Sequence, residues 1–107
     1  MFTRVVEFHS KRGKAKEVAN ALNDKVMPIL HKQLGFVDAI VLTSTTQPDQ
    51  LLGLSFWNSA DDADRYNRET YPRVNEILQP ILETAPQVQT FNVEIFTTHK
   101  ITAGKAA

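Results

Sequence analysis

The chain has 107 residues, of which 42% are hydrophobic and 22% are charged, values typical of one small globular domain. Twelve basic and twelve acidic residues give a formal net charge of zero, which excludes the broad basic surface that nucleic acid or an anionic membrane requires. The lack of cysteine excludes disulfides and a cysteine nucleophile, and without a signal-like or membrane-spanning stretch the sequence predicts a cytoplasmic protein.

The first half of the chain predicts a strand, a helix and two further strands. Residues 2–9 are rich in β-branched and aromatic types, which is typical of a strand. From Ala15 to Leu30, apolar side chains recur at spacings of three and four and predict one buried helical face. Pro28 is expected to kink this helix or cap its straight part, and Gly35 to end it. Two strands joined by a polar turn follow at residues 36–43 and 50–57.

The second half predicts an interrupted helix and a last strand. Ser59, with Asp62 three residues later, is close to a capping box and marks the start of the helix. Pro72 and Pro80 lie within the apolar stripe of this helix and are expected to break it into pieces. Apolar and polar side chains alternate over residues 88–97, which predicts a strand. Residues 98–107 form a tail, for which a loose end and a strand exchanged with a partner are both open interpretations.

The order β-α-β-β-α-β predicts an α+β, ferredoxin-like domain with a four-stranded antiparallel sheet, of which two helices can cover only one face. The alternation within the strands assigns one apolar set to the covered face: Val6, Phe8, Ile40, Leu42, Leu52, Leu54, Phe56, Phe91, Val93 and Ile95. A second set falls on the opposite face: Val5, Val37, Ala39, Val41, Leu51, Trp57 and Phe96. A sheet face in water should be mostly polar, so we predict a homodimer that joins two sheets face to face in an α/β barrel.

Several segments resemble the antibiotic-biosynthesis-monooxygenase-like family of dimeric α/β barrels. The resemblance lies in the stretch GLSFWNSADDA from Gly53 to Ala63, followed by Tyr66-Asn67-Arg68 and Tyr71-Pro72, and upstream in Gly13-Lys14, Glu17, Pro28 and Gly35-Phe36. It covers residues 2–97 and implies that residues 1–107 form a single domain of this family. The fold follows from it more specifically than the chemistry, since members of the family differ in activity.

The resemblance has different implications for two kinds of chemistry. Haem-degrading members use an Asn on the first strand and a Trp and a His on the second helix. This chain has Val6, Tyr66 and Glu76 there, which argues against haem degradation. Members that oxidise polycyclic phenols without a cofactor use a Trp that closes the third strand and an Asn four residues before it. Trp57 is kept here, but Gly53 replaces the Asn, so half of that site is present.

Three residues are candidates for chemistry, and two of them have a structural alternative. Trp57 is a candidate wall for a flat substrate, or an anchor of the core or of an interface. Tyr66 faces inward from the second helix, where its hydroxyl could hydrogen-bond a ligand or act as an acid. His9 is a candidate proton carrier or a dimer-interface residue. The histidines lack i, i+4 spacing and a carboxylate motif, so no metal site is expected.

Two functions are compatible with these observations. The first is a cofactor-independent monooxygenase for a small aromatic or quinone-like molecule, in which Trp57 orients the ring and Tyr66 binds a substrate oxygen. The second is a non-catalytic dimeric module that binds a small ligand or a partner protein. A void that touches both Trp57 and Tyr66 would favour the enzyme, whereas a packed interior would favour the module.

Overall fold

The structure is a computed structural model, and it describes residues 1–99 of the chain. Strand β1 (Phe2–His9) is followed by a first helical segment, the hairpin of β2 (Phe36–Thr43) and β3 (Gln50–Trp57), a second helical segment and β4 (Gln87–Asn92). This order of elements confirms the sequence prediction. Whether residues 100–107 are exchanged with a partner lies outside the described residues.

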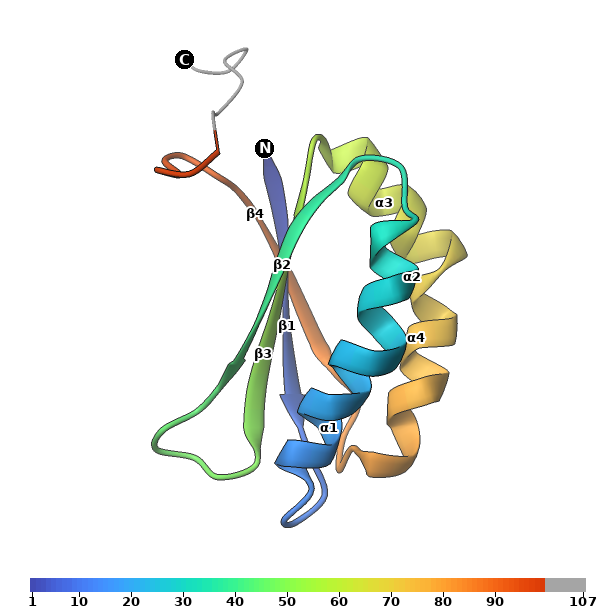
Figure 1. The fold of residues 1–107 in the computed structure, drawn as a ribbon, viewed down its shortest axis with the longest axis vertical. Helices are drawn as coiled ribbons and strands as arrows, with labels where there is room; N and C mark the ends of the chain where they lie inside the picture. The colour runs from blue at the N-terminus through green and yellow to red at the C-terminus, as the bar shows by residue number, and fades with distance from the viewer. Residues whose placement is uncertain (100–107) are drawn as a thin grey trace.

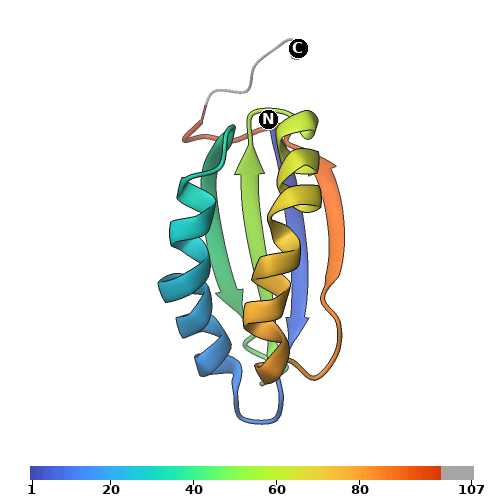
Figure 2. The same ribbon diagram turned by 90° about the vertical axis from the view of Figure 1, so that its right-hand side faces the viewer.

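The four strands form one antiparallel sheet in the order β2-β3-β1-β4. Both helical segments lie on the same face of this sheet, and the other face is left open (Figures 1 and 2). Each helical segment connects two strands that are separated by one other strand, which is the split arrangement of a ferredoxin-like fold. The predicted fold class is therefore confirmed for the single chain.

The first helical segment is continuous through α1 (Ala15–Ala21), η1 (Leu22–Val26) and α2 (Met27–His31). The middle part, η1, is a π-helix in which the Met27 N–H donates to the Leu22 carbonyl, five residues back. Pro28 has no N–H to donate to the carbonyl four residues before it, and a π-turn adjusts the helical register near such a gap. The expected effect of Pro28 therefore takes the form of a π-turn within the helix.

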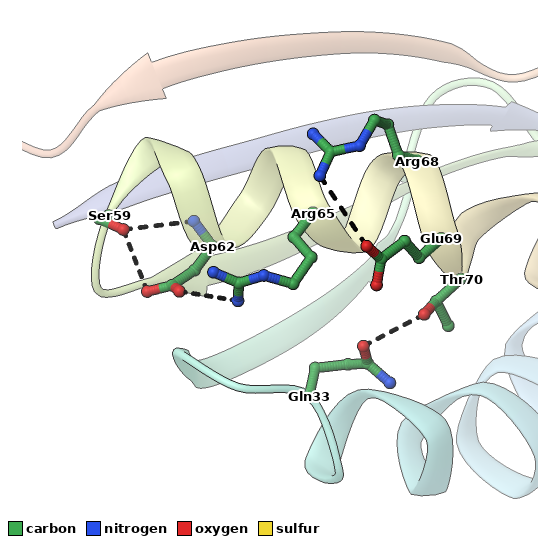
Figure 3. Close-up of polar contacts among 7 residues, drawn as sticks. All are labelled: Gln33, Ser59, Asp62, Arg65, Arg68, Glu69 and Thr70. Carbon is green, nitrogen blue, oxygen red and sulfur yellow. Dashed lines mark hydrogen bonds and ion pairs between the residues drawn. The ribbon is translucent and has the colours of Figure 1, made fainter.

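The second helical segment consists of three pieces. They are α3 (Ala60–Glu69), α4 (Tyr71–Leu78) and η2 (Gln79–Ile81), with Pro72 in the first turn of α4 and Pro80 within η2, as the sequence predicts. Ser59 Oγ accepts a hydrogen bond of 3.2 Å from the Asp62 N–H and caps α3 (Figure 3). The Thr70 hydroxyl donates to Gln33 Oε1 at 3.2 Å and connects the two helical segments.

The register of the sheet corrects the predicted faces of β2, β3 and β4. In β1, Val6 and Phe8 face the helices and Val5 faces away, as predicted. The other strands are reversed relative to the prediction: Ile40, Leu42, Leu52, Leu54, Phe56 and Phe91 lie on the open face, whereas Ala39, Val41, Leu51 and Trp57 lie beneath the helices. Apolar residues at consecutive positions make the two faces of β2 and β3 look alike in sequence, so only pairing with β1 decides between them.

Strand β4 is shorter than predicted. It ends at Asn92, which pairs with Phe2, the first residue of β1, and one further hydrogen bond of 2.9 Å joins the Val93 N–H to the Met1 carbonyl. The chain then leaves the sheet, and neither Val93 nor Ile95 is a strand residue. Phe96 instead packs edge-on against Phe56 of the open face, with 5.2 Å between ring centroids. The prediction of a strand over residues 88–97 is therefore wrong for its last five residues.

The core lies between the sheet and the helices, and its largest fully buried side chains are Trp57, Leu51, Leu78 and Val18. The open face carries large apolar side chains that water reaches: Ile40, Leu42 and Phe91 are 43%, 45% and 50% exposed. The register therefore places different apolar residues on the open face than predicted. The part formed by β2 and β3 remains apolar, whereas β1 and β4 add polar residues such as Glu7 and Gln89. Within residues 1–99, the helices are too short or too polar to cross a membrane.

Candidate functional site

A small cavity lies between the covered face of the sheet and both helical segments. Its volume is about 40 Å³, and most of its lining is apolar, including Val6, Leu22, Val26 and Val74. One water molecule needs about 10 to 15 Å³ of such volume, so the cavity holds on the order of three waters. Ligand pockets measure roughly 300 to 1,000 Å³. Even a single aromatic ring would therefore require the site to widen.

Two local features keep this space open. A Cβ atom at Gly53 would lie 3.1 Å from Cε2 of Phe8, so a longer side chain at this position of β3 would enter the space beside that ring. From the opposite wall, the π-helical turn η1 contributes Leu22 and Val26 to the lining. Gly53 thus leaves volume at a position where a longer side chain would fill it.

The polar lining of the cavity is dominated by Arg4, which is only 3% exposed. Its Nη2 donates to Oδ1 of Asn67 at 3.0 Å. The guanidinium carbon lies 4.6 Å from the ring centroid of Tyr71 and 5.1 Å from that of Tyr66, which are cation–π distances. Among residues 1–99 no carboxylate forms an ion pair with Arg4. Burial lowers the pKa of Arg4 from its ordinary value, yet the group stays cationic at neutral pH.

The two tyrosines beside Arg4 are neutral donors at physiological pH. Burial raises the pKa of Tyr66 to about 12, although the nearby charge of Arg4 opposes the shift. Burial also raises the pKa of Tyr71. The Tyr71 hydroxyl is buried and makes no hydrogen bond of good geometry within the described part of the chain, although the Arg4 guanidinium lies close enough to oppose the rise of its pKa by charge and by hydrogen bonding. Unpaired buried hydroxyls are rare and unfavourable, so this atom marks a place where a ligand or water can bind.

Trp57 does not reach the cavity. It is fully buried, its Nε1 donates to Oγ of Ser55 at 2.9 Å, and its ring packs against Tyr66 and Phe36 at centroid distances of 5.0 and 5.7 Å. Its position matches the core-anchor alternative of the sequence analysis. The structure therefore brings Trp57 and Tyr66 together, but only Tyr66 lines the void.

His9 lies away from these residues. It occupies the end of β1, on the open face, and its Nε2 is 2.6 Å from Oε2 of Glu7 on the same face. The cavity lining does not include it. Within residues 1–99 no three side chains of His, Cys, Asp or Glu lie close enough together to hold a metal ion.

Sequence reasoning does not single out Arg4 or Tyr71, the most unusual residues of the site. A signal for Arg4 exists, because it shares the alternation of Phe2, Val6 and Phe8 in β1 and so places a charge on the covered face. The orphan hydroxyl of Tyr71 has no sequence signal, since it depends on how α3 joins α4.

Comparison with known proteins gives a family and a fold. A family model described as "Antibiotic biosynthesis monooxygenase" matches residues 1–73, and no curated protein matches the chain significantly. SnoaB, a cofactor-independent oxygenase from Streptomyces nogalater, aligns with a TM-score of 0.73 and 16% identity over 92% of this chain and 97% of its own. A protein of unknown function from Nitrosomonas europaea aligns with a TM-score of 0.75, 11% identity and coverages of 90% and 91%. A conserved protein from Methanosarcina mazei Go1 aligns with a TM-score of 0.70 and 22% identity over 85% of this chain and 91% of its own.

Proposed function

The chain belongs to the antibiotic biosynthesis monooxygenase family, and on this premise we propose that it oxidises a small phenol or quinol with dioxygen, without metal or flavin. The fold also occurs in a cofactor-independent oxygenase, SnoaB, which supports the proposal by analogy. The observation that supports the proposal is the partly open cavity, which combines apolar walls with a few polar groups.

The proposed reaction needs no outside reductant. One atom of dioxygen is added to a ring carbon para to the hydroxyl, two hydrogens leave the substrate, and the second oxygen atom leaves as water. A phenol thereby becomes a quinone and supplies the four electrons that reduce dioxygen. A quinol already carries the second oxygen, so it loses two hydrogen atoms with their two electrons, and dioxygen leaves as hydrogen peroxide. The cavity, about 40 Å³ in volume, must widen to take any aromatic substrate, and a one-ring substrate requires less widening than a polycyclic one.

Tyr66 and Trp57 have different parts in this proposal. The Tyr66 side chain lines the cavity, and its neutral hydroxyl is available to hydrogen-bond a substrate oxygen. Trp57 packs behind the Tyr66 ring and holds it in place, which differs from the substrate wall that the family resemblance implies. His9 takes no part in the proposed step because it lies on the open face.

The proposal is tested by oxygen uptake and quinone absorbance with the purified protein and a panel of one-ring and two-ring phenols and quinols. We expect oxidation of a one-ring substrate and a loss of about tenfold in kcat/KM for Tyr66→Phe, the value of one neutral hydrogen bond. Arg68→Gln, which changes an exposed residue of α3, is the matched control and should leave the rate unchanged. Oxidation no faster than in protein-free buffer across the panel would rule the proposal out.

A second candidate function is a non-catalytic module that binds a small ligand. Two observations favour it: the cavity is small, and its titratable lining residues are Arg4, Tyr66 and Tyr71, none of which can accept a proton at neutral pH. Native mass spectrometry of the purified protein tests this alternative. A bound small molecule that is not turned over in air would favour the module.

We also propose that a second copy of the chain covers the open face, sheet against sheet. The exposed side chains of Ile40, Leu42 and Phe91 support this arrangement, because monomeric proteins rarely leave such a face in water. Of the described residues after β4, Phe96 packs on Phe56 and His99 lies 3.2 Å from Asp38, so the contacts of residues 93–99 with the open face lie near Phe56. The rest of the face remains available to the second copy.

A further inference from the structure

We propose that Arg4 and Tyr71 form an oxyanion site, which binds the substrate's hydroxyl oxygen as a phenolate and so makes a general base unnecessary. This inference rests on the proposed function for the class of substrate. It adds the ionisation state in which the substrate is bound and the residues that impose it.

The charge of Arg4 is the first reason for this assignment. A buried cation normally has an acidic partner, because desolvation of an unpaired charge is unfavourable. Arg4 has only an amide oxygen of Asn67 and the faces of two tyrosine rings. An anionic ligand in the cavity would supply the missing opposite charge.

The second reason is that hydrogen-bond donors converge on the same space. Arg4 makes one side-chain hydrogen bond within residues 1–99, to Asn67, and the guanidinium group has five N–H donors. The Tyr71 hydroxyl makes no hydrogen bond of good geometry within the same residues, with only the Arg4 guanidinium close to it, and both residues line the cavity. A phenolate oxygen accepts several hydrogen bonds and would satisfy both groups at once.

The position of Arg4 also fits a ligand that arrives from outside. A groove of about 160 Å³ runs between α3 and β4 at the edge of the sheet, and Arg4 and Asn67 line it together with Asp64 and Thr90. Figure 2 shows α3 beside this edge. Because Arg4 lines both the groove and the cavity, its side chain separates the two spaces. A phenol that enters from the groove would meet the guanidinium before the apolar interior.

The protonation states of the lining residues give the third reason. Burial raises the pKa of both tyrosines, so neither accepts a proton from a bound phenol at neutral pH. The cavity lining contains no carboxylate and no histidine. The proton must therefore leave to water, and a cation that stabilises the phenolate is the means that the chain offers for this ionisation.

The test uses 4-nitrophenol without oxygen, because its phenolate absorbs visible light and its ionisation can be followed without turnover. Trp57, the single tryptophan, packs against Tyr66 and reports occupancy of the cavity by fluorescence quenching. We expect the apparent pKa of bound nitrophenol to lie about one unit or more below that of free nitrophenol. Nitrobenzene, which has no hydroxyl, measures the affinity of the apolar walls alone.

Variants assign the effect to the two residues. Arg4→Met should weaken phenolate binding about tenfold or more and leave nitrobenzene binding unchanged, and Tyr71→Phe should reduce the pKa shift by a smaller amount. Arg73→Gln, an exposed arginine of α4, is the matched control. Circular dichroism shows whether each variant is folded. If Arg4→Met does not fold, Tyr71→Phe alone provides the test.

Three results would overturn the oxyanion site. They are no binding of nitrophenol at millimolar concentration, a bound pKa equal to the free value, and wild-type binding of phenolate by both variants. The proposed oxidation can fail separately. Phenolate binding without oxygen uptake would leave the site standing and exclude the oxidation, whereas oxygen uptake that neither variant changes would exclude the site alone.

Discussion

Arg4 shows how a binding residue can reduce the stability of the domain that carries it. Its guanidinium is buried without an ion-pair partner in the described residues, and only one hydrogen bond and two aromatic rings compensate for its lost hydration. Buried charges of this kind are often less favourable than apolar side chains of similar volume. An apolar side chain at this position would therefore favour stability, whereas the arginine favours the proposed ligand binding.

We accordingly expect Arg4→Met to keep or raise the free energy of unfolding, by up to about 2 kcal/mol, although it weakens binding. Urea denaturation followed by circular dichroism measures this change. Arg73→Gln should alter stability by less than about 0.5 kcal/mol, since this side chain is exposed. A loss of more than about 2 kcal/mol in Arg4→Met would instead mean that the cation–π contacts hold the fold together.

The raised pKa of Tyr66 predicts that the protein loses stability in alkaline solution. Its pKa is about 12 in the folded chain and about 10 in the unfolded chain, so above pH 10 the unfolded state releases a proton that the folded state keeps. The associated stability is fully present below pH 10 and is lost as the pH rises to 12, in total about 2 to 3 kcal/mol. Urea denaturation between pH 8 and 12 should show a shallower decline for Tyr66→Phe, and an equal decline would contradict this origin.

At the scale of elements, the turn between α2 and β2 depends on a glycine. Gly35 has a φ angle of +84°, and a Cβ atom there would overlap the carboxyl group of Asp62, the residue whose N–H the α3 cap binds. Gly13 has a similar φ angle of +76°, but a Cβ atom there would meet nothing within 4 Å. The two glycines thus share one backbone requirement and differ in their surroundings.

Alanine substitutions should separate these two effects. Gly13→Ala is expected to destabilise the protein by about 1 to 2 kcal/mol through the left-handed backbone alone. Gly35→Ala should lose more, about 3 kcal/mol or above, because Asp62 must also move. Thermal unfolding of both variants provides the measurement. If both variants lost the same stability, the Asp62 side chain would be able to move away from the added Cβ atom with little loss of free energy.

The elements themselves could be predicted from sequence to a large extent, because their signals are local. Ser59 caps α3 through its own side chain, and the prolines divide the second helical segment by their missing N–H groups. The strand faces could not be predicted, because both sides of β2 and β3 are apolar and the choice depends on pairing with β1. The end of β4 likewise depends on where β1 begins.

The candidate site was less predictable than the fold, since it arises from residues far apart in sequence. Tyr66 could be placed at the cavity by the periodicity of its helix. Its contact with Arg4, 62 residues earlier, depends on α3 lying across β1. The family resemblance singles out Trp57, whose structural position is the packed core behind that contact.

For the whole molecule, the proposed dimer gives a prediction about the open face. Ile40→Asp places a charge among its apolar side chains, and we expect this variant to be monomeric when the wild type is a dimer. Leu34→Asp is the matched control: Leu34 is 72% exposed but lies in the turn after α2, outside the sheet. Light scattering with size-exclusion chromatography distinguishes the species. A monomeric wild type at micromolar concentration would exclude the dimer.

Strand β1 serves both surfaces of the molecule, because Arg4 and Val6 point beneath the helices while Val5 between them points outward. Substitution of an inward-pointing side chain can therefore alter ligand binding and leave the proposed dimer unchanged. Substitution of an outward-pointing side chain can alter the dimer and leave ligand binding unchanged. Insertion or deletion of one residue in this strand has a different effect, since it would exchange its inward and outward sets. The guanidinium would then be stranded between subunits, and both properties would be lost in one step.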